Sequence, residues 1–414
     1  MKNLLLIFLL LMAQVPASAH ENTLLTEAVG KFQRFYNSNN SDSVFALFST
    51  RIQGMMPADK TTQMLTQVQA SMGNMKGYVY VRTMQAFSYY RVTFDKATVM
   101  LVTSLDNGRL DNFRFVADEP EEARQPSNFV LSTATGKVYG TVTVPPGAKK
   151  VPVVFLIAGS GPTDRNGNNN IGLRTNAYRM IADSLLKAGI ACLRFDKRGV
   201  GESAAAMTGE AALSFDDMVA DAVGFVQLLK KDARFSYVII AGHSEGSLVG
   251  MIAAQKGGVK KFISIAGAGE PADKTIKDQY LAQSKTKADE VTILLDSLKA
   301  GYGVYNVKED YMSLFRSSIQ PYLRSWLKYD PQAEIKKLHI PVLLVQGEND
   351  LQVSSANALL LKKAYPAARL TLLPRMNHIL KDAPADRSAN FATYANPELS
   401  LSDGFIAALV RFVK

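Results

Sequence analysis

Apolar and polar positions divide the chain into two regions. From residue 20 to residue 120, apolar positions first recur at helical spacing and later form extended runs. The segments are 24–36, 44–48, 64–72, 78–81 and 97–102. Helices followed by strands favour a small α+β domain. The acidic residues that begin at Asp118 lead into residues 121–128, which we expect to be a linker.

From residue 129 to residue 414, short apolar runs alternate with longer amphipathic segments. The runs are 138–144, 153–157, 190–195, 237–240, 262–265, 342–345 and 370–373. Runs that are apolar on both faces indicate a mostly parallel sheet covered by helices on both sides. Reactive groups in such sheets gather at the carboxyl ends of the strands. The fold class we predict is therefore α/β, with a small α+β domain in front.

The first residues are typical of an export signal. Lys2 is followed by an apolar run at 4–12 and by small residues at 17–19. The apolar run is too short for a membrane span, which needs about 20 residues. We therefore expect a signal peptide at 1–19, no stable membrane anchor, and a protein that is periplasmic or extracellular.

The charge pattern adds little to this picture. The formal net charge is +10, but basic residues occur singly or in pairs rather than in long runs. This favours a soluble basic surface over a nucleic-acid site, and it leaves open a mild preference for acidic substrates. The single cysteine, Cys192, lies in an apolar run and is expected to be a buried small hydrophobe.

One serine motif follows a predicted strand. Gly242-His243-Ser244-Glu245-Gly246 is G-x-S-x-G between the run at 237–240 and an apolar helical stretch. A tight strand-to-helix turn requires small residues at Gly242 and Gly246, because side chains there would collide with backbone. We predict that Ser244 is a nucleophile with an exposed hydroxyl.

A serine nucleophile needs a general base, and the chain has four histidines. His20 lies at the expected cleavage site, His243 should point away from Ser244, and His339 precedes a strand. Only His378 follows a late strand, so we predict that it is the base.

A carboxylate should orient the base. Asp350 follows the run at 342–345, which gives the chain order Ser, Asp, His. Glu348 is the alternative acid, although Gly347 more naturally starts a turn that delivers Asp350.

The oxyanion of an acyl-transfer intermediate needs backbone N–H donors. We expect one donor from Glu245 and the other from the loop after 153–157, with Ser160 as the first choice and Gly161 as the second. Two other motifs are weak. The G-x-G-x-x-A at 199–204 lies after a late strand, and the polar loop at 164–168 lacks the spacing of a calcium loop. We therefore expect no cofactor and no metal.

The region from about 130 to the end resembles the α/β-hydrolase superfamily, in the secreted esterase-like branch grouped with serine aminopeptidases. The segments that carry the resemblance are 158–167, 196–203, 242–246, 347–350 and 377–378. One departure is Ala158-Gly159, where many relatives have His-Gly. The front region resembles cone-shaped, nuclear-transport-factor-like domains.

The resemblance implies a lid, which we expect at about 268–338. Tyr302, Tyr305, Tyr322 and Trp326 in this segment are candidates for lining a substrate pocket or for forming the core of the lid. The expected partner is a small-molecule ester that is cleaved through an acyl-enzyme. Peptide or amide hydrolysis and a non-catalytic binding protein are the alternatives, and the oligomeric state is not predicted.

Overall fold

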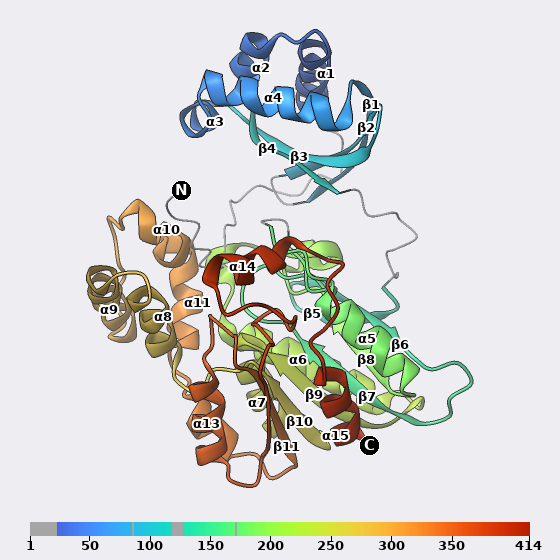
Figure 1. The fold of residues 1–414 in the computed structure, drawn as a ribbon. Helices are drawn as coiled ribbons and strands as arrows, with labels where there is room; N and C mark the ends of the chain where they lie inside the picture. The colour runs from blue at the N-terminus through green and yellow to red at the C-terminus, as the bar shows by residue number, and fades with distance from the viewer. Residues whose placement is uncertain (1–22, 85–86, 118–126, 170–171) are drawn as a thin grey trace. The chain divides into compact units, whose positions relative to one another are not determined.

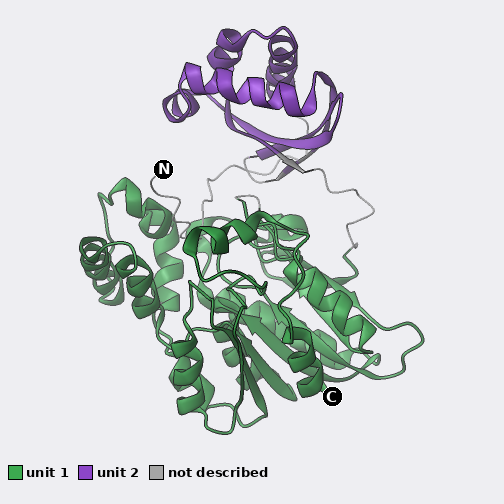
Figure 2. Ribbon diagram, in the orientation of Figure 1, with its two compact units in different colours: residues 1–11, 126–414 green, residues 12–125 purple. Residues whose placement is uncertain are grey.

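The computed structural model describes residues 23–84, 87–117, 127–169 and 172–414, which form two compact units (Figures 1 and 2). The division falls between Gln125 and Pro126, inside the interval where the sequence predicts a linker. The expected export signal at residues 1–19 lies outside the described residues. Within the described ranges, no helix is long and apolar enough to cross a membrane.

The smaller unit places its helices before its strands, as the hydrophobic pattern predicts. The strands form an antiparallel sheet in the order β1-β2-β3-β4. The elements are α1 (Thr23–Asn37), α2 (Ser41–Leu47), α3 (Thr50–Met55), α4 (Ala58–Met72), β1 (Met75–Met84), β2 (Phe87–Phe94), β3 (Thr98–Asp106) and β4 (Arg109–Ala117).

The core of the smaller unit forms where α1 meets the sheet. Val29, Phe32 and Tyr36 lie on one face of α1, and all three are buried. The ring of Phe32 lies 4.5 Å from that of Phe113, and Tyr36 contacts Phe94 edge-on at 5.8 Å. Such aromatic pairs stabilise a core beyond the area that they bury.

The larger unit contains an eight-stranded sheet in the order β12-β11-β10-β9-β7-β8-β6-β5. The strands from β7 to β12 run parallel to one another, while β6 is antiparallel to β8 and to the edge strand β5. The strands are β5 (Phe129–Thr133), β6 (Gly136–Thr143), β7 (Val151–Ile157), β8 (Ala191–Phe195), β9 (Phe235–His243), β10 (Lys261–Ile265), β11 (Val342–Gly347) and β12 (Arg369–Leu373).

Helices cover both faces of this sheet (Figure 1). On one face, α5 (Ala177–Lys187) and α15 (Phe405–Val413) pack against buried residues such as Ile239. On the other face lie α6 (Phe215–Lys231) and α7 (Glu245–Gly257), where a Cβ on Gly250 would approach Ile240 to 2.8 Å. Neighbouring residues of β9 therefore face opposite layers, which explains why the strands are apolar on both faces.

A helical segment lies between β10 and β11, where the lid is expected. It consists of α8 (Ala272–Leu281), α9 (Lys285–Lys299), α10 (Glu309–Phe315), α11 (Gln320–Trp326) and α12 (Pro331–Lys336). The chain continues through α13 (Ser355–Ala364) and α14 (Arg387–Ala392). Short 3₁₀ turns complete the unit: η2 (Gly201–Ala206), η3 (Glu210–Ala212), η4 (Ser317–Ile319) and η5 (Thr393–Ala395). Cys192 is buried, as predicted.

Candidate active site

Ser244 lies in the turn between β9 and α7, with φ of 54° and ψ of −122°. Residues other than glycine rarely adopt a positive φ, so the backbone is strained at this serine. A Cβ on Gly242 would lie 2.1 Å from the carbonyl oxygen of Gly246, and a Cβ on Gly246 would lie 2.5 Å from that of Ala158. The predicted backbone collisions at both glycines are confirmed.

Asp350 and His378 come together from the ends of β11 and β12. The Nδ1 atom of His378 lies 2.8 Å from Oδ2 of Asp350, and both side chains are buried. The other carboxylate oxygen, Oδ1, accepts hydrogen bonds from the backbone N–H groups of Gln352 and Val353 at 2.8 and 2.9 Å. The side chain of Gln346 donates to Oδ2 at 3.1 Å. The carboxylate is therefore held on both oxygens.

This geometry fixes the tautomer of His378. Because an ionised carboxylate can only accept, the hydrogen between Asp350 and His378 belongs to Nδ1 of the imidazole. In the neutral imidazole, Nε2 is then unprotonated and able to accept a proton. Within the described residues, no hydrogen bond joins Nε2 to the hydroxyl of Ser244, and such bonds often form only when substrate is bound.

Glu348, the alternative acid, is exposed on the same loop. Its backbone N–H donates to the carbonyl of Leu373, which anchors the loop to β12. The structure thus brings Asp350, and not Glu348, to the predicted base. A Cβ on Gly347 would lie 2.0 Å from the carbonyl oxygen of Met376, so a glycine is required where this turn begins.

His243 points away from Ser244, as expected, but it has a role that the sequence did not reveal. Its Nε2 contacts the carbonyl oxygen of His378 at 2.8 Å, and its Nδ1 contacts the hydroxyl of Tyr178 at 2.8 Å. Because the carbonyl only accepts, Nε2 carries the hydrogen and Tyr178 donates to Nδ1. Burial lowers the pKa of His243 to about 3, so the ring stays neutral. His243 therefore fixes the backbone of the loop that carries His378.

The predicted oxyanion donors lie beside the serine. A Cβ on Gly159 would be 3.0 Å from Cβ of Ser244, so this glycine allows the loop after β7 to approach the serine. Ser160 and Glu245 line the pocket at Ser244. Within the described residues their backbone N–H groups donate to no backbone carbonyl, and Glu245 opens α7, where N–H groups lack helical partners. Gly161, the second choice, does not line the pocket.

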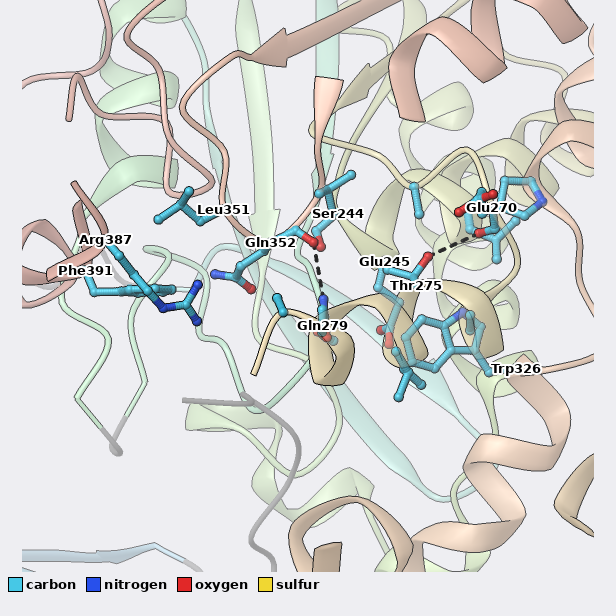
Figure 3. Close-up of a pocket in the computed structure, with 18 residues that line it drawn as sticks. Ser244, Glu245, Glu270, Thr275, Gln279, Trp326, Leu351, Gln352, Arg387 and Phe391 are labelled. Carbon is cyan, nitrogen blue, oxygen red and sulfur yellow. Dashed lines mark hydrogen bonds between the residues drawn. The ribbon is translucent and has the colours of Figure 1, made fainter. Parts of the chain in front are cut away.

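A pocket opens at Ser244 between the helical segment and the loop after β11 (Figure 3). The side chain of Gln279 on α8 donates to the carbonyl of Gln352 at 3.4 Å, which connects the two walls. The lining residues are Ser160, Ser244, Glu245, Leu248, Ala268, Glu270, Ala272, Thr275, Ile276, Gln279, Ala282, Trp326, Pro331, Leu351, Gln352, Val353, Arg387 and Phe391.

Of the predicted aromatic pocket residues, Trp326 lines the pocket and the other three do not. Tyr302 and Tyr305 follow α9 and are 70% and 77% exposed, so they neither line this pocket nor form the core of the helical segment. Tyr322 is buried behind the pocket wall, where its hydroxyl donates to Oε1 of Glu245 at 2.9 Å. Helical spacing shows that these residues share a segment, but not which surface each one faces.

Within the described ranges, we find no group of three or more side chains that could hold a metal ion, whether histidine, cysteine, aspartate or glutamate. The motif at 199–204 begins the turn η2, where a Cβ on Gly201 would lie 2.2 Å from Oδ2 of Asp196. Asp196 also accepts hydrogen bonds from the side chain of Arg165. These residues therefore hold two loops together at the end of β8.

The sheet topology, the strained serine after β9 and the chain order Ser, Asp, His give the larger unit the fold of the α/β-hydrolases. Residues 171–308 match a family model described as Serine aminopeptidase, S33.

The comparisons with known proteins also find esterases. Esterase EstD of Thermotoga maritima is 24% identical over 371 residues, which cover 84% of this chain and 86% of the relative. Among solved structures, Est1E of Butyrivibrio proteoclasticus with bound ferulic acid is 17% identical, with a TM-score of 0.45. The match covers 69% of this chain and 96% of the Est1E chain. The esterase EaEST of Exiguobacterium antarcticum is 17% identical, with a TM-score of 0.42. The match covers 69% of this chain and 98% of the EaEST chain.

Proposed function

We propose that this protein is a serine hydrolase that cleaves carboxylic esters, with Ser244 as nucleophile, His378 as general base and Asp350 as the acid that orients it. The observation that carries the proposal is the buried Asp350–His378 pair beside a serine held in a strained turn. The similarity to Esterase EstD along most of both chains supports esters as the substrate class.

The reaction would proceed in two steps. The hydroxyl oxygen of Ser244 attacks the ester carbonyl carbon while Nε2 of His378 takes the hydroxyl proton. The backbone N–H groups of Ser160 and Glu245 stabilise the oxyanion. The intermediate then collapses, and the departing alkoxide takes the proton from His378. In the second step water attacks the acyl-serine, His378 takes a proton from the water, and the serine oxygen leaves with that proton.

The alternatives use the same residues differently. Peptide or amide hydrolysis is possible with the same machinery, because fold and triad do not select the leaving group. A non-catalytic binding protein would leave Ser244 unreactive. The strain at Ser244 and the full set of hydrogen bonds on Asp350 favour an enzyme, because backbone strain of this kind is retained mainly at functional sites.

A direct test compares 4-nitrophenyl butanoate with butanoyl 4-nitroanilide, which share an acyl group and differ in the bond cleaved. Alanine 4-nitroanilide tests the aminopeptidase alternative. We expect the ester to have the highest kcat/KM. Faster turnover of either anilide would instead assign the protein as an amidase or peptidase. No turnover of any substrate by a folded protein would support the binding-protein alternative.

One end of the pocket carries a guanidinium without an acidic partner. Arg387, at the start of α14, lies 5.1 Å over the ring of Phe391, and no ion pair reaches it among the described residues. Figure 3 shows Arg387, Phe391 and Leu351 on one side of Ser244, with Glu245 and Trp326 on the other.

Arg387 and Leu351 follow His378 and Asp350 in the chain. Because His378 must protonate the leaving oxygen, we infer that the alcohol part of the ester lies toward Arg387.

We therefore expect Arg387 to favour esters whose alcohol part is anionic. In Arg387→Gln, kcat/KM for 4-carboxyphenyl butanoate should fall by about fivefold, the upper range for an exposed charge pair. The neutral 4-carbamoylphenyl ester should change less, and added salt should reduce the difference between the two esters. Arg411→Gln removes the same charge from an exposed position on α15 and serves as the control. Equal effects of both variants would show that the preference comes from overall charge.

We also propose that the protein is exported and acts in the periplasm or outside the cell. The proposal rests on Lys2, the apolar run at 4–12 and the small residues at 17–19.

A further inference from the structure

Lys197 is a buried lysine that reaches the predicted oxyanion loop. It follows β8 and is only 7% exposed. Its Nζ atom donates a hydrogen bond to the carbonyl oxygen of Gly159 at 2.6 Å. A lysine is almost never buried without a specific partner, because removing its charge from water is costly. This contact is therefore a strong constraint on the position of the loop.

The contact acts on the peptide bond that supplies the first oxyanion donor. The carbonyl of Gly159 and the N–H of Ser160 belong to the same planar peptide group, and in a trans peptide they point in opposite directions. A donor fixed on the Gly159 oxygen therefore fixes the direction of the Ser160 N–H. It also polarises the peptide, which makes this N–H a stronger donor.

The other side of Gly159 is held as well. Its backbone N–H donates to the hydroxyl of Tyr178 at 3.2 Å, and Tyr178 in turn donates to His243. Both polar groups of Gly159 are thus bound to buried side chains, while its Cα lies against Ser244. The loop after β7 has little freedom to rotate the Ser160 N–H away from the serine.

Two opposing effects act on the charge of the Lys197 side chain. Burial lowers its pKa, while the nearby carboxylate of Glu245 favours its protonated form. The two side chains do not form a direct ion pair within the described residues, and Oε2 of Glu245 has no hydrogen-bond partner. In its protonated form, Lys197 would therefore stabilise a nearby negative charge in this buried site more than it would in water.

We propose that Lys197 is a positioning residue of the oxyanion hole, which orients and polarises the Gly159–Ser160 peptide so that the Ser160 N–H stabilises the developing negative charge. This inference rests on the proposed function. Lys197 touches neither substrate nor serine, and it acts through the peptide. Its effect should therefore appear in the transition state and not in binding of the neutral substrate.

The test is Lys197→Met, which removes the donor and the charge but keeps an unbranched side chain. Removing one oxyanion donor directly costs about 10²–10³ in kcat, so we expect a smaller loss here, about tenfold to a hundredfold, with KM nearly unchanged. Affinity for an alkyl trifluoromethyl ketone, whose serine adduct carries an oxyanion, should fall in parallel. Affinity for the analogous alcohol, which forms no adduct, should not.

Two further variants sharpen the result. Lys261→Met is the matched control, because Lys261 donates to the carbonyls of Phe412 and Val413 at the opposite end of the sheet. It should leave kcat and ketone affinity unchanged. Tyr178→Phe removes the neutral contact on the N–H side of Gly159 and should weaken ketone affinity less than Lys197→Met does.

The outcomes separate this inference from the proposed function. Because inhibition constants are measured on the active protein alone, partial misfolding of Lys197→Met does not alter them. If the parent hydrolyses esters and Lys197→Met binds the ketone as tightly as the parent, the inference is wrong and the function stands. If the parent neither hydrolyses esters nor binds the ketone, the proposed function itself is wrong.

Discussion

Ser244→Ala is expected to reduce ester turnover by about 10⁶-fold, toward the level that the remaining site can support without a nucleophile. The variant loses only the hydroxyl, and alanine adopts the strained turn about as well as serine does. We therefore expect thermal unfolding to stay nearly unchanged. The measurement is kcat/KM for a 4-nitrophenyl ester, together with the unfolding midpoint of both proteins.

A fluorophosphonate probe gives an independent readout of the same residue. The parent protein should gain the mass of one probe, and Ser244→Ala should gain none. Ser247→Ala is the matched control, because Ser247 lies on the next turn and its hydroxyl is bound to that of Ser264 at 2.7 Å. Retained turnover in Ser244→Ala would falsify the assignment of the nucleophile. Absence of labelling in the parent would support the binding-protein alternative.

Asp350→Asn is expected to lower kcat by about 10⁴-fold, the loss known when the acid of a serine protease triad becomes an amide. The asparagine can turn its NH₂ group toward Nδ1 of His378 and donate to it. The imidazole would then carry its hydrogen on Nε2, which could no longer accept the proton of Ser244. KM should change little, because Asp350 is buried and does not line the pocket.

Glu348→Gln is the control for this prediction. Glu348 lies two residues earlier on the same loop and its side chain is exposed, so the same chemical change should cost little. The ratio of the two effects is measured on one ester at one pH. A larger loss in Glu348→Gln than in Asp350→Asn would mean that the loop rearranges and that Glu348 is the acid.

The predicted strands of the larger unit could be read from the sequence because each is a short apolar run between polar segments. The runs at 153–157 and 342–345 correspond to β7 and β11. The edge strand β5 was missed, because only its alternate residues are partly buried and its pattern is weak. In the smaller unit β2 and β4 were also missed, because polar residues interrupt them.

The identities of Ser244, Asp350 and His378 as candidates also came from the sequence. Each follows an apolar run, and parallel strands bring their carboxyl ends to one edge of a sheet. Predicting residues at this edge requires only the order of the strands and not the packing of side chains. This reasoning therefore predicted the candidate triad. It could not predict the positions of Tyr302 and Tyr305, because their exposure depends on the path of a loop.

The sequence by itself determined the fold class, the turn at Ser244 and the candidate acid and base, because these depend on local patterns and on residues near strand ends. The tertiary structure alone decided which side chains support them. Tyr178 and Lys197 reach Gly159 from 19 and 38 residues away in the chain, and His243 reaches the carbonyl of His378 across 135 residues. Neither spacing nor composition encodes such contacts, because they form only when separate elements pack into one core.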